Sequence, residues 1–420
     1  MIRKFKCTNY KQLILPEDGL EFKRVNLFIG SNNSGKTNLL EAISFFSDVV
    51  KYGASNALGK RSFSNILNKY SDTKKVSFEM EFNDNVTQDS ASPTELLTLK
   101  YDTEIQFTES NGYYFSKEIL SNEKPRSTKL PKPFEYFTFT STNPASSYGY
   151  CSFQDPKKHH ASKSLTIQSP ETFFRQTELI MGQLNKGKDR DGFLDNLNPT
   201  IKNVRAYLDG WFHYNMARIS IKEVVKPSKM TQSDTYLSLD GTNFQNLMRL
   251  FHDDHRIEQI EAFLKEENIL PKLVRMYTPT IQAENTVTEF SIDNKIFKLS
   301  ELSDGTIRLL LLLLITKFQK TPTVFLDEPE SNLHPAWLAK VYKMVDESTN
   351  QLFISTHSAD LLDKFTNDFM ADKINIFVVE EGSITLLNQH RDIIAERIEE
   401  GWELGDLYRV GDTLIGGWPW

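Results

Sequence analysis

The sequence has little cysteine, no long apolar run and no excess of positive charge. Its 420 residues include 2 cysteines, Cys7 and Cys151, which are too few for a disulfide framework or a zinc cluster. The longest apolar run, residues 309–315, is far shorter than the ~20 residues that cross a bilayer. Residues 1–5 alternate in polarity and lack the features of a signal peptide. We therefore expect a cytoplasmic protein that is neither exported nor membrane-spanning.

The formal net charge of −7 argues against a surface that is basic all over, so nucleic acid would need a local patch. One candidate lies in a stretch with few acids, where aromatic residues accompany the basic ones. Solvated loop lysines explain the same stretch, because nucleic-acid footprints usually concentrate Arg and Lys more densely. The residues concerned are Lys124, Arg126, Lys129, Lys132, Lys157, Lys158 and Lys163, with Tyr136, Phe137, Phe139 and Tyr148.

A phosphate-loop pattern occupies residues 30–37, between an apolar run at 25–29 and a segment with helical spacing of apolar residues. Its glycines let backbone N–H groups point at phosphate oxygens, and the following helix adds its positive end. In such a loop, Lys36 would bridge the β- and γ-phosphates of ATP and Thr37 would ligate Mg²⁺. The residues predicted to bind nucleotide here are Gly30, Ser31, Asn32, Asn33, Ser34, Gly35, Lys36, Thr37 and Asn38.

Two adjacent carboxylates end a second apolar run, residues 323–326. Successive strand side chains diverge, so the two acids need not share a role. We expect Asp327 to hold the magnesium and Glu328 to orient or deprotonate the attacking water. After the next predicted strand, His357 could hydrogen-bond the γ-phosphate. Glu328, His357 and Lys36 are the predicted catalytic residues, and Thr37 and Asp327 are the predicted metal ligands.

Ser303 and Gly305 stand at the start of a leucine-rich segment predicted to be a helix over 307–317. A serine and a glycine at a helix start form an anion site. Since the phosphate loop already holds its own nucleotide, this second site would face the nucleotide of another subunit, which predicts a homodimer or a larger assembly of dimers. A plain helix cap is the other interpretation.

The remaining pattern outlines the fold. Residues 76–82, 98–106 and 114–120 predict antiparallel strands, whereas 121–169 predict long loops. Apolar residues at helical spacing between 170 and 273 predict helices, and Asp293-Asn294 predicts a hairpin turn. Strands and helices alternate after residue 299, which predicts a mainly parallel sheet covered on both faces.

These motifs, in this order, resemble the ABC ATPase heads of SMC proteins, RecF and the OLD (overcoming lysogenization defect) ATPases. The resemblance covers about the first fifty residues and everything after about Leu299. It is closest to OLD-like phage-defence ATPases, including Abi-type and PARIS-type ATPases, in residues 30–37, 302–308, 327–335, 355–358 and the C-terminal run 404–411.

The resemblance implies an α/β fold, an ABC-type P-loop ATPase head with a mixed sheet, flanking helices and an antiparallel β subdomain. We expect residues 1–169 to form the N-terminal part of the head with that subdomain. Residues 170–273 would be an inserted helical arm, and 274–420 the C-terminal part with the signature, Walker B and H-loop segments. A Q-loop glutamine normally completes the magnesium shell, and Gln106 and Gln154 are the candidates.

The function implied is an ATPase that acts as a nucleotide-gated sensor or regulator of a separate effector in anti-phage defence. OLD nucleases carry a Toprim domain after the head, but the residues after His357 lack paired carboxylates for that chemistry. The effector, a Toprim-like nuclease or a toxin, would therefore be another chain. A RecF- or SMC-like ATPase acting directly on DNA is the alternative, and a scaffold that traps ATP without turnover is a third.

Several other signals point to ordinary surface features. His252 and His255 lack further ligands for zinc, and residues 157–160 are interpreted in the same way. Residues 186–191 predict a turn. Trp402, Trp418 and Trp420 could contact a partner or pack on the head, and the sequence leaves both open.

Overall fold

The structure is a computed structural model, and it describes residues 1–59, 66–82, 98–108, 112–123, 133–141, 148–154, 161–168, 171–176, 193–281 and 284–416. The chain divides into two compact units. Unit 1 comprises Met1–Trp211 and Lys373–His390, and unit 2 comprises Phe212–Asp372 and Arg391–Trp420. The three segments predicted from the sequence, 1–169, 170–273 and 274–420, stay a prediction about domains.

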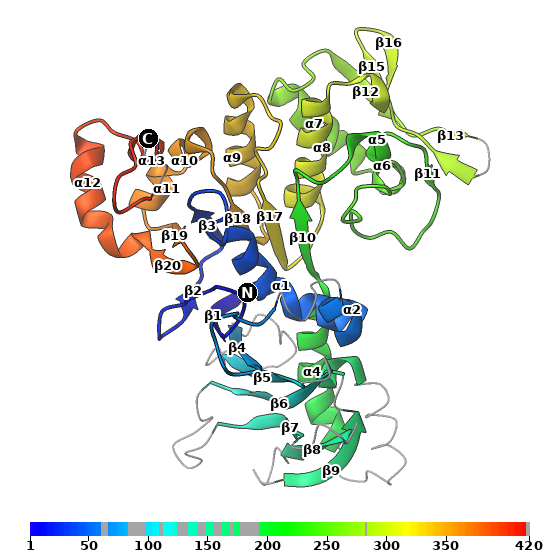
Figure 1. Ribbon diagram of the computed structural model, residues 1–420. Coiled ribbons are helices and arrows are strands. Elements are labelled where there is room, and N and C mark those ends of the chain that lie inside the picture. The colour runs from blue at the N-terminus through cyan, green and yellow to red at the C-terminus, as the bar shows by residue number, and fades with distance from the viewer. Residues whose placement is uncertain are drawn as a thin grey trace. The chain divides into compact units, whose positions relative to one another are not determined.

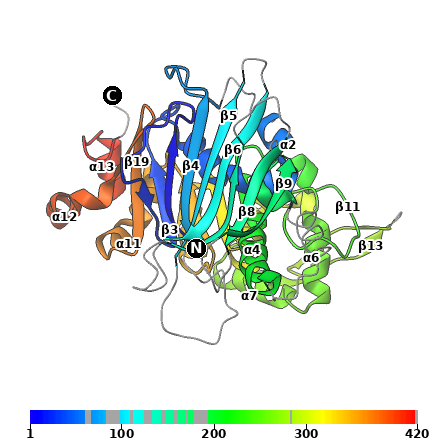
Figure 2. The ribbon, with the colours of Figure 1, turned by 90° about the horizontal axis from the view of Figure 1, so that it is seen from below.

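The largest sheet of unit 1 is antiparallel, with eight strands in the order β2-β1-β4-β5-β6-β7-β8-β9. Figure 2 shows β4, β5, β6, β8 and β9 of this sheet. Buried and partly exposed side chains alternate along β5, as expected for a sheet with one covered face. The predicted antiparallel strands are confirmed as β4, β5 and β6. The first five strands of this sheet are β1 (Ile2–Thr8), β2 (Leu20–Glu21), β4 (Lys75–Phe82), β5 (Leu99–Phe107) and β6 (Tyr113–Asn122).

Three further strands correct the prediction of long loops over residues 121–169. They are β7 (Glu135–Thr140), β8 (Tyr148–Gln154) and β9 (Ala161–Gln168), which extend the sheet from β6 by antiparallel pairing. Polar residues lie within and between these strands in the sequence, so their local pattern is weak. The strands form because the edge of the existing sheet offers hydrogen-bond partners to their backbones. The periodicity of the sequence does not reveal such partners.

Helix α1 (Lys36–Tyr52) packs on this sheet through aromatic side chains. The ring of Phe45 stacks on Phe78 with centroids 5.4 Å apart, and Phe46 meets Phe78 and Tyr101 edge-on. All four side chains are buried, and burial of each contributes about 1.5–3 kcal/mol. This contact fixes the helix whose first turn follows the phosphate loop. Unit 1 also contains α2 (Ala54–Gly59) and α4 (Phe193–Asp209).

Strand β3 (Val25–Ile29) leads into the phosphate loop and has all five residues buried. It runs parallel to β19 (Ile374–Glu380), which pairs antiparallel with β20 (Ser383–Leu386). Phe28 stacks on Phe377 with ring centroids 5.2 Å apart. The pairing anchors the start of the loop to a strand from the far end of the chain. The short helix η7 (Leu387–His390) follows β20.

In unit 2, β17 (Thr323–Asp327) and β18 (Gln351–Ser355) run parallel, and Asp327 lies opposite Ser355. β10 (Trp211–Asn215) lies on the other side of β17. Helices α8, α9 and α10 lie beside these strands in Figure 1. They and their neighbours are α8 (Asp304–Leu313), η5 (Leu314–Phe318), η6 (Pro335–Trp337), α9 (Leu338–Asp346), α10 (Ala359–Lys364) and α11 (Thr366–Met370).

Two small sheets and three helices complete the middle of unit 2. The predicted hairpin is confirmed, since Asp293 and Asn294 have φ of 52° and 61° between β15 and β16. Residues 170–273 contain strands as well as the predicted helices. The elements are α5 (Ile221–Val224), β11 (Ser228–Lys229), α6 (Phe244–Asp253), α7 (Ile257–Glu266), β12 (Leu273–Tyr277), β13 (Thr280–Ile281), β14 (Asn285–Thr286), β15 (Glu289–Ile292), β16 (Lys295–Lys298) and η4 (Leu299–Glu301).

The C-terminal run 404–411 forms α13 (Leu404–Arg409), after α12 (Arg391–Glu399), and α13 packs on α10. A Cβ at Gly405 would lie 2.1 Å from the Ala359 carbonyl oxygen, so only glycine allows this approach. Arg409 also pairs with Asp360 and Asp363. The run therefore holds the helix that begins directly after His357.

The predicted α/β class is confirmed, with parallel and antiparallel strands, flanking helices and an antiparallel β subdomain. No helix in the described part of the chain combines the length and the apolar character that crossing a bilayer requires.

Candidate active site

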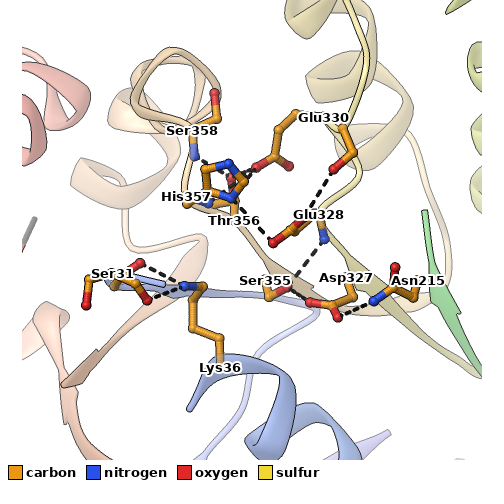
Figure 3. Close-up of polar contacts among 12 residues, drawn as sticks. Ser31, Lys36, Asn215, Asp327, Glu328, Glu330, Ser355, Thr356, His357 and Ser358 are labelled. Atoms are coloured by element: carbon orange, nitrogen blue, oxygen red, sulfur yellow. Dashed lines mark hydrogen bonds and ion pairs between the residues drawn. The ribbon is translucent and has the colours of Figure 1, made fainter. Parts of the chain in front are cut away.

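The predicted site residues fall into two groups. The phosphate loop belongs to unit 1, whereas the carboxylates, His357 and Ser303 belong to unit 2. Each group is described by itself, and Figure 3 labels the central residues of both.

Two glycines shape the phosphate loop. Gly30 has φ of 148°, and a Cβ there would lie 2.2 Å from the carbonyl oxygen of Val379, so the loop leaves β3 against the backbone of β19. Gly35 has φ of 115°, a value that L side chains rarely adopt. Glycine is therefore required at both positions, for close approach at the first and for backbone conformation at the second.

Helix α1 begins at Lys36 without the usual features of a helix start. Among the described contacts its first turn has no side-chain cap, and it contains no acidic residue. Most helix starts use a Ser, Thr, Asp or Asn cap, and acids there favour the positive end of the helix. A start without either is suited to a bound anion, because the anion would supply both the acceptor and the negative charge.

Lys36 is 7% exposed, and its Nζ donates hydrogen bonds of 2.8 Å to the carbonyl oxygens of Gly30 and Ser31 (Figure 3). The ammonium group is thereby held over the loop. Ser34 is buried, and its hydroxyl has no partner within the described residues. A buried unpartnered hydroxyl is costly unless it gains a partner when a ligand binds.

The other loop residues differ in accessibility. Asn32 and Asn33 are exposed, Ser31 and Thr37 are half-buried, and Asn33 has φ of 65°. The Asn38 amide oxygen accepts a 2.7 Å hydrogen bond from Lys11, which also pairs with Glu41. The Asn38 side chain is thus engaged within the protein, and its backbone in the first turn of α1 is the part that could contact phosphate.

Asp327 ends β17 and is 3% exposed. Its Oδ1 accepts a hydrogen bond from the Ser355 hydroxyl, and its Oδ2 accepts one of 2.7 Å from the Asn215 amide (Figure 3). Two donors on opposite sides therefore fix the carboxylate. Asn215 belongs to no sequence motif, so the sequence did not identify it as a partner of Asp327. The one indication of its strand is the short aromatic run Trp211–Asn215, which lies in a region where helices were predicted.

Glu328 follows the end of β17 and has a different set of neighbours from Asp327. Its Oε1 lies 3.5 Å from His357 Nδ1, and its Oε2 accepts a 3.2 Å hydrogen bond from Ser331. Its φ is 52°, a left-handed value that is strained for any residue with a Cβ. Backbone strain of this kind collects at functional sites, where it aims a side chain.

Glu330 supports the turn that carries His357. Its Oε1 accepts hydrogen bonds from the Thr356 hydroxyl at 2.6 Å and the His357 backbone N–H at 3.3 Å. Burial raises the pKa of the Glu330 carboxyl. Ser358 then caps α10 by accepting from the Leu361 N–H at 3.2 Å. The histidine backbone is thus fixed on both sides, while its imidazole is 42% exposed near Glu328.

Ser303 is the N-cap of α8, and its hydroxyl accepts from the Thr306 N–H at 3.2 Å. Ser303 therefore acts as a helix cap in the structure. Its second role, binding the phosphate of another subunit's nucleotide, stays a prediction. Ser303 is exposed, and Gly305 is covered by the Trp337 ring, 3.1 Å from where a Cβ would stand. Any larger residue at Gly305 would push against that ring.

Other predicted residues do not join either group. The Gln106 amide donates to the carbonyl oxygens of Lys74 and Phe107, so it is occupied within its sheet. The Gln154 side chain lies outside the described residues. Within the described part of the chain, no group of three or more His, Cys, Asp and Glu side chains is placed to hold a metal ion.

The predicted basic patch lies outside the described residues, apart from the backbone of Lys163, and so do residues 157–160, 186–191, Trp418 and Trp420. Tyr136, Phe137 and Phe139 are buried and cannot stack on bases, whereas Tyr148 is exposed. Trp402 is 37% exposed.

The donor groups fit magnesium. The predicted ligands are a hydroxyl oxygen at Thr37 and a carboxylate at Asp327, and Mg²⁺ prefers hard oxygen ligands and usually keeps several waters beside one or two carboxylates. Neither cysteine is available as a softer ligand, because Cys7 and Cys151 are buried.

A family model described as "AAA domain, putative AbiEii toxin, Type IV TA system" matches residues 25–363. The chain belongs to this family. The match runs from β3 through α10 and so includes the phosphate loop, Asp327, Glu328 and His357. The predicted ATPase fold is confirmed at the level of this AAA family, while the finer resemblance to OLD-like and PARIS-type ATPases stays a prediction.

Solved structures with a remotely similar fold include SMC heads. One, bound to the C-winged helix domain of ScpA, is 13% identical with a TM-score of 0.49, covering 92% of this chain and 97% of that chain. The SMC head domain from Thermotoga maritima is 14% identical with a TM-score of 0.41, covering 92% and 97%. A Pyrococcus furiosus Smc head bound to the C-terminal domain of ScpA is 13% identical with a TM-score of 0.44, covering 94% and 99%. Among curated proteins, none matches the chain.

Proposed function

We propose that this AAA family chain binds ATP with Mg²⁺ and hydrolyses it. Binding is supported by the uncapped start of α1 and by buried Lys36. Hydrolysis is supported by one observation above all: Asp327 and Glu328 have separate partners, and Glu328 is kept on strained backbone beside His357. A protein that only trapped ATP would need the loop but not this glutamate.

In the proposed reaction, water attacks the γ-phosphorus, a new P–O bond forms, and the bond from phosphorus to the β–γ bridging oxygen breaks, giving ADP and phosphate. Lys36 holds the β- and γ-phosphates, Glu328 orients the water and accepts its proton, and His357 hydrogen-bonds the γ-phosphate. Bound Mg²⁺ would neutralise phosphate charge, with Thr37 and Asp327 as its protein ligands.

Two copies of the chain form the complete site in this proposal. The phosphate loop of one subunit holds the nucleotide, and the α8 start of the other, with Ser303 and Gly305, contacts its γ-phosphate. Exposure of Ser303 supports this role, since a cap hydroxyl on the surface can reach an external phosphate. Hydrolysis would then depend on association of the two copies.

Phosphate release by the purified chain tests the enzymatic proposal. Glu328→Gln should bind ATP like the wild type but lose turnover by about 100- to 10,000-fold, the range for a missing general base. Glu396→Gln, an exposed carboxylate on α12, is the matched control and should keep the wild-type rate. Equal rates in all three proteins would exclude Glu328 from the reaction, and ATP retained by the wild type without phosphate release would favour the non-hydrolysing scaffold.

At the level of biology, we propose a nucleotide-gated regulator of a separate effector in anti-phage defence. The family description and the OLD-like motifs support this proposal. The neighbouring gene should encode a Toprim-like nuclease or a toxin, and protection from phage in plaque assays should need both genes and intact Glu328.

A RecF- or SMC-like ATPase acting on DNA is the alternative. It predicts neighbouring repair genes and DNA binding that weakens steeply with salt. Three of the aromatic residues that accompany the basic ones in the sequence are buried, so their side chains are not available to stack on the bases of a single strand.

A further inference from the structure

The end of β10 holds the Walker B aspartate from two directions. The Asn215 Nδ2 donates to Asp327 Oδ2 at 2.7 Å, and the Met216 backbone N–H donates to the Asp327 carbonyl oxygen at 3.0 Å. Asn215 therefore holds the side chain of Asp327 and the adjacent Met216 holds its backbone (Figure 3 shows the side-chain contact).

The orientation of the Asn215 amide is fixed by its other end. Its Oδ1 accepts a 3.0 Å hydrogen bond from the Arg218 backbone N–H. An N–H needs an acceptor, so the oxygen must face Arg218 and the NH₂ group must face the carboxylate. Asn215 thus presents a donor to Asp327, and turning the amide over would place its oxygen against the carboxylate and break the Arg218 contact.

Arg308 connects this turn to the helix that begins at Ser303. Its guanidinium donates through Nη1 to the carbonyl oxygen of Met216. Arg308 is 7% exposed, and its Nε has no partner within the described residues. Burying a guanidinium with incomplete pairing is unfavourable, and the Met216 carbonyl and the charge of Asp304 are the interactions that offset this cost.

The contacts form one continuous path within unit 2. Ser303 and Arg308 lie on the same helix, about 7.5 Å apart along its axis at 1.5 Å per residue. Arg308 contacts Met216, and the adjacent Asn215 contacts Asp327. A shift of α8 along its axis would therefore pull on the backbone that carries the donor to Asp327.

We propose that Asn215 is a positioning residue that orients the Asp327 carboxylate for the metal, and that Arg308 couples this orientation to the position of α8. The inference rests on the proposed function, in which Asp327 binds Mg²⁺ and Ser303 contacts the nucleotide of a second copy. It adds a connection between the two sites of a dimer. When Ser303 of one subunit contacts the nucleotide of the other, α8 would change the orientation of Asp327 in its own subunit.

Nucleotide and metal binding measured separately test the positioning role. The probes are a fluorescent ATP analogue, with and without Mg²⁺, and Mn²⁺ followed by its EPR signal in the presence of the non-hydrolysable analogue. Asn215→Leu should raise the metal concentration for half-saturation about 10- to 100-fold, the range seen when a partner of a metal ligand is lost. Metal-free nucleotide binding should change less than about 2-fold.

Conservative and control variants separate positioning from folding. Asn215→Gln retains the amide donor and should recover part of the lost metal affinity. Asn350→Leu removes a buried amide elsewhere in unit 2, which donates to the Ile315 and Gln319 carbonyl oxygens at the opposite end of β18. It should lower stability without changing metal half-saturation. Wild-type metal dependence in Asn215→Leu, in a protein whose wild type binds and hydrolyses ATP, would overturn the inference and leave the proposed function intact.

A double-mutant cycle tests the connection through Arg308. Arg308→Met should weaken metal binding on its own, and Arg308→Lys should weaken it less because a donor remains. Combined with Asn215→Leu, Arg308→Met should add little, because both changes break one path. Fully additive effects would show that Arg308 acts elsewhere and would overturn the coupling. Failure of the wild type to bind ATP would instead overturn the proposed function.

Discussion

The backbone at Glu328 offers a quantitative test of whether strain is retained for function. Its φ of 52° costs about 1–2 kcal/mol for a residue with a Cβ, whereas glycine adopts it freely. Glu328→Ala and Glu328→Gly lose the same side-chain contacts to Ser331 and His357. The difference between the two variants therefore isolates the backbone.

Glycine also gives the unfolded chain more freedom, which offsets about 0.5–1 kcal/mol of the gain. We expect the free energy of unfolding of Glu328→Gly to exceed that of Glu328→Ala by about 0.5–1 kcal/mol, although both lose phosphate release. Chemical denaturation with equal m-values measures this difference in the transition that reports unit 2. An alanine variant as stable as the glycine variant would refute the assignment of strain at this position.

Three further predictions concern other parts of the chain. Lys36→Ala should weaken ATP binding about 10- to 100-fold, since hydrogen bonds to charged groups contribute about 1.5–3 kcal/mol; fluorescent-nucleotide titration measures this, and Lys222→Ala is the control. Gly405→Ala should lower the free energy of unfolding by about 1–3 kcal/mol, because a Cβ there would meet α10 at 2.1 Å; Gly59→Ala, which meets open space, should change it little, and equal effects would contradict the packing. Burial raises the pKa of Glu118 from 4.5 to about 7, so the folded state binds more protons than the unfolded state between these values. The free energy of unfolding should therefore fall as pH rises from about 4.5 to about 7, by up to roughly 3 kcal/mol, and Glu118→Gln should flatten this dependence.

Local patterns were sufficient for the parts of the site that lie within one segment. The phosphate loop needs glycines at fixed places and a strand and a helix on either side, and all of these are visible in residues 25–46. The strand before Asp327 and the strand before His357 are short apolar runs that only a covered parallel sheet accommodates. The sequence therefore predicted the strands and the helix beside the loop, the two carboxylates and the histidine, while the roles of these residues stay a prediction.

Features that depend on distant partners could not be predicted in this way. Strands β7 to β9 owe their form to the edge that β6 presents, not to strong periodicity of their own. Asn215 has a role only because β10 lies beside β17, and Glu330 because the turn at Thr356 comes within 2.6 Å. The left-handed backbone at Glu328 is equally invisible, since nothing in the Asp-Glu-Pro sequence requires it.

Dependence on a distant partner also explains why the sequence did not identify the Q-loop glutamine. A glutamine was expected near the metal, and Gln106 was a candidate because of its residue type alone. Its amide is bound to two carbonyl oxygens in the antiparallel sheet, whereas an asparagine at the end of β10 contacts Asp327. The amide that contacts Asp327 is that of Asn215, and its position on the strand beside β17 identifies it, whereas its residue type does not.

The central claim is that Ser303 of one copy completes the active site around the nucleotide held by another copy. The most direct measurement uses mixed dimers of Lys36→Ala and Ser303→Arg chains, purified through two different tags. Each variant alone should be inactive, but the mixed dimer has one site with an intact phosphate loop and an intact α8 start. It should release phosphate at up to about half the wild-type rate, and at less than half if the lost Ser303 contact of the subunit that supplies Asp327 also weakens its metal ligand. An inactive mixed dimer, or a Ser303→Arg protein with full activity alone, would contradict the account.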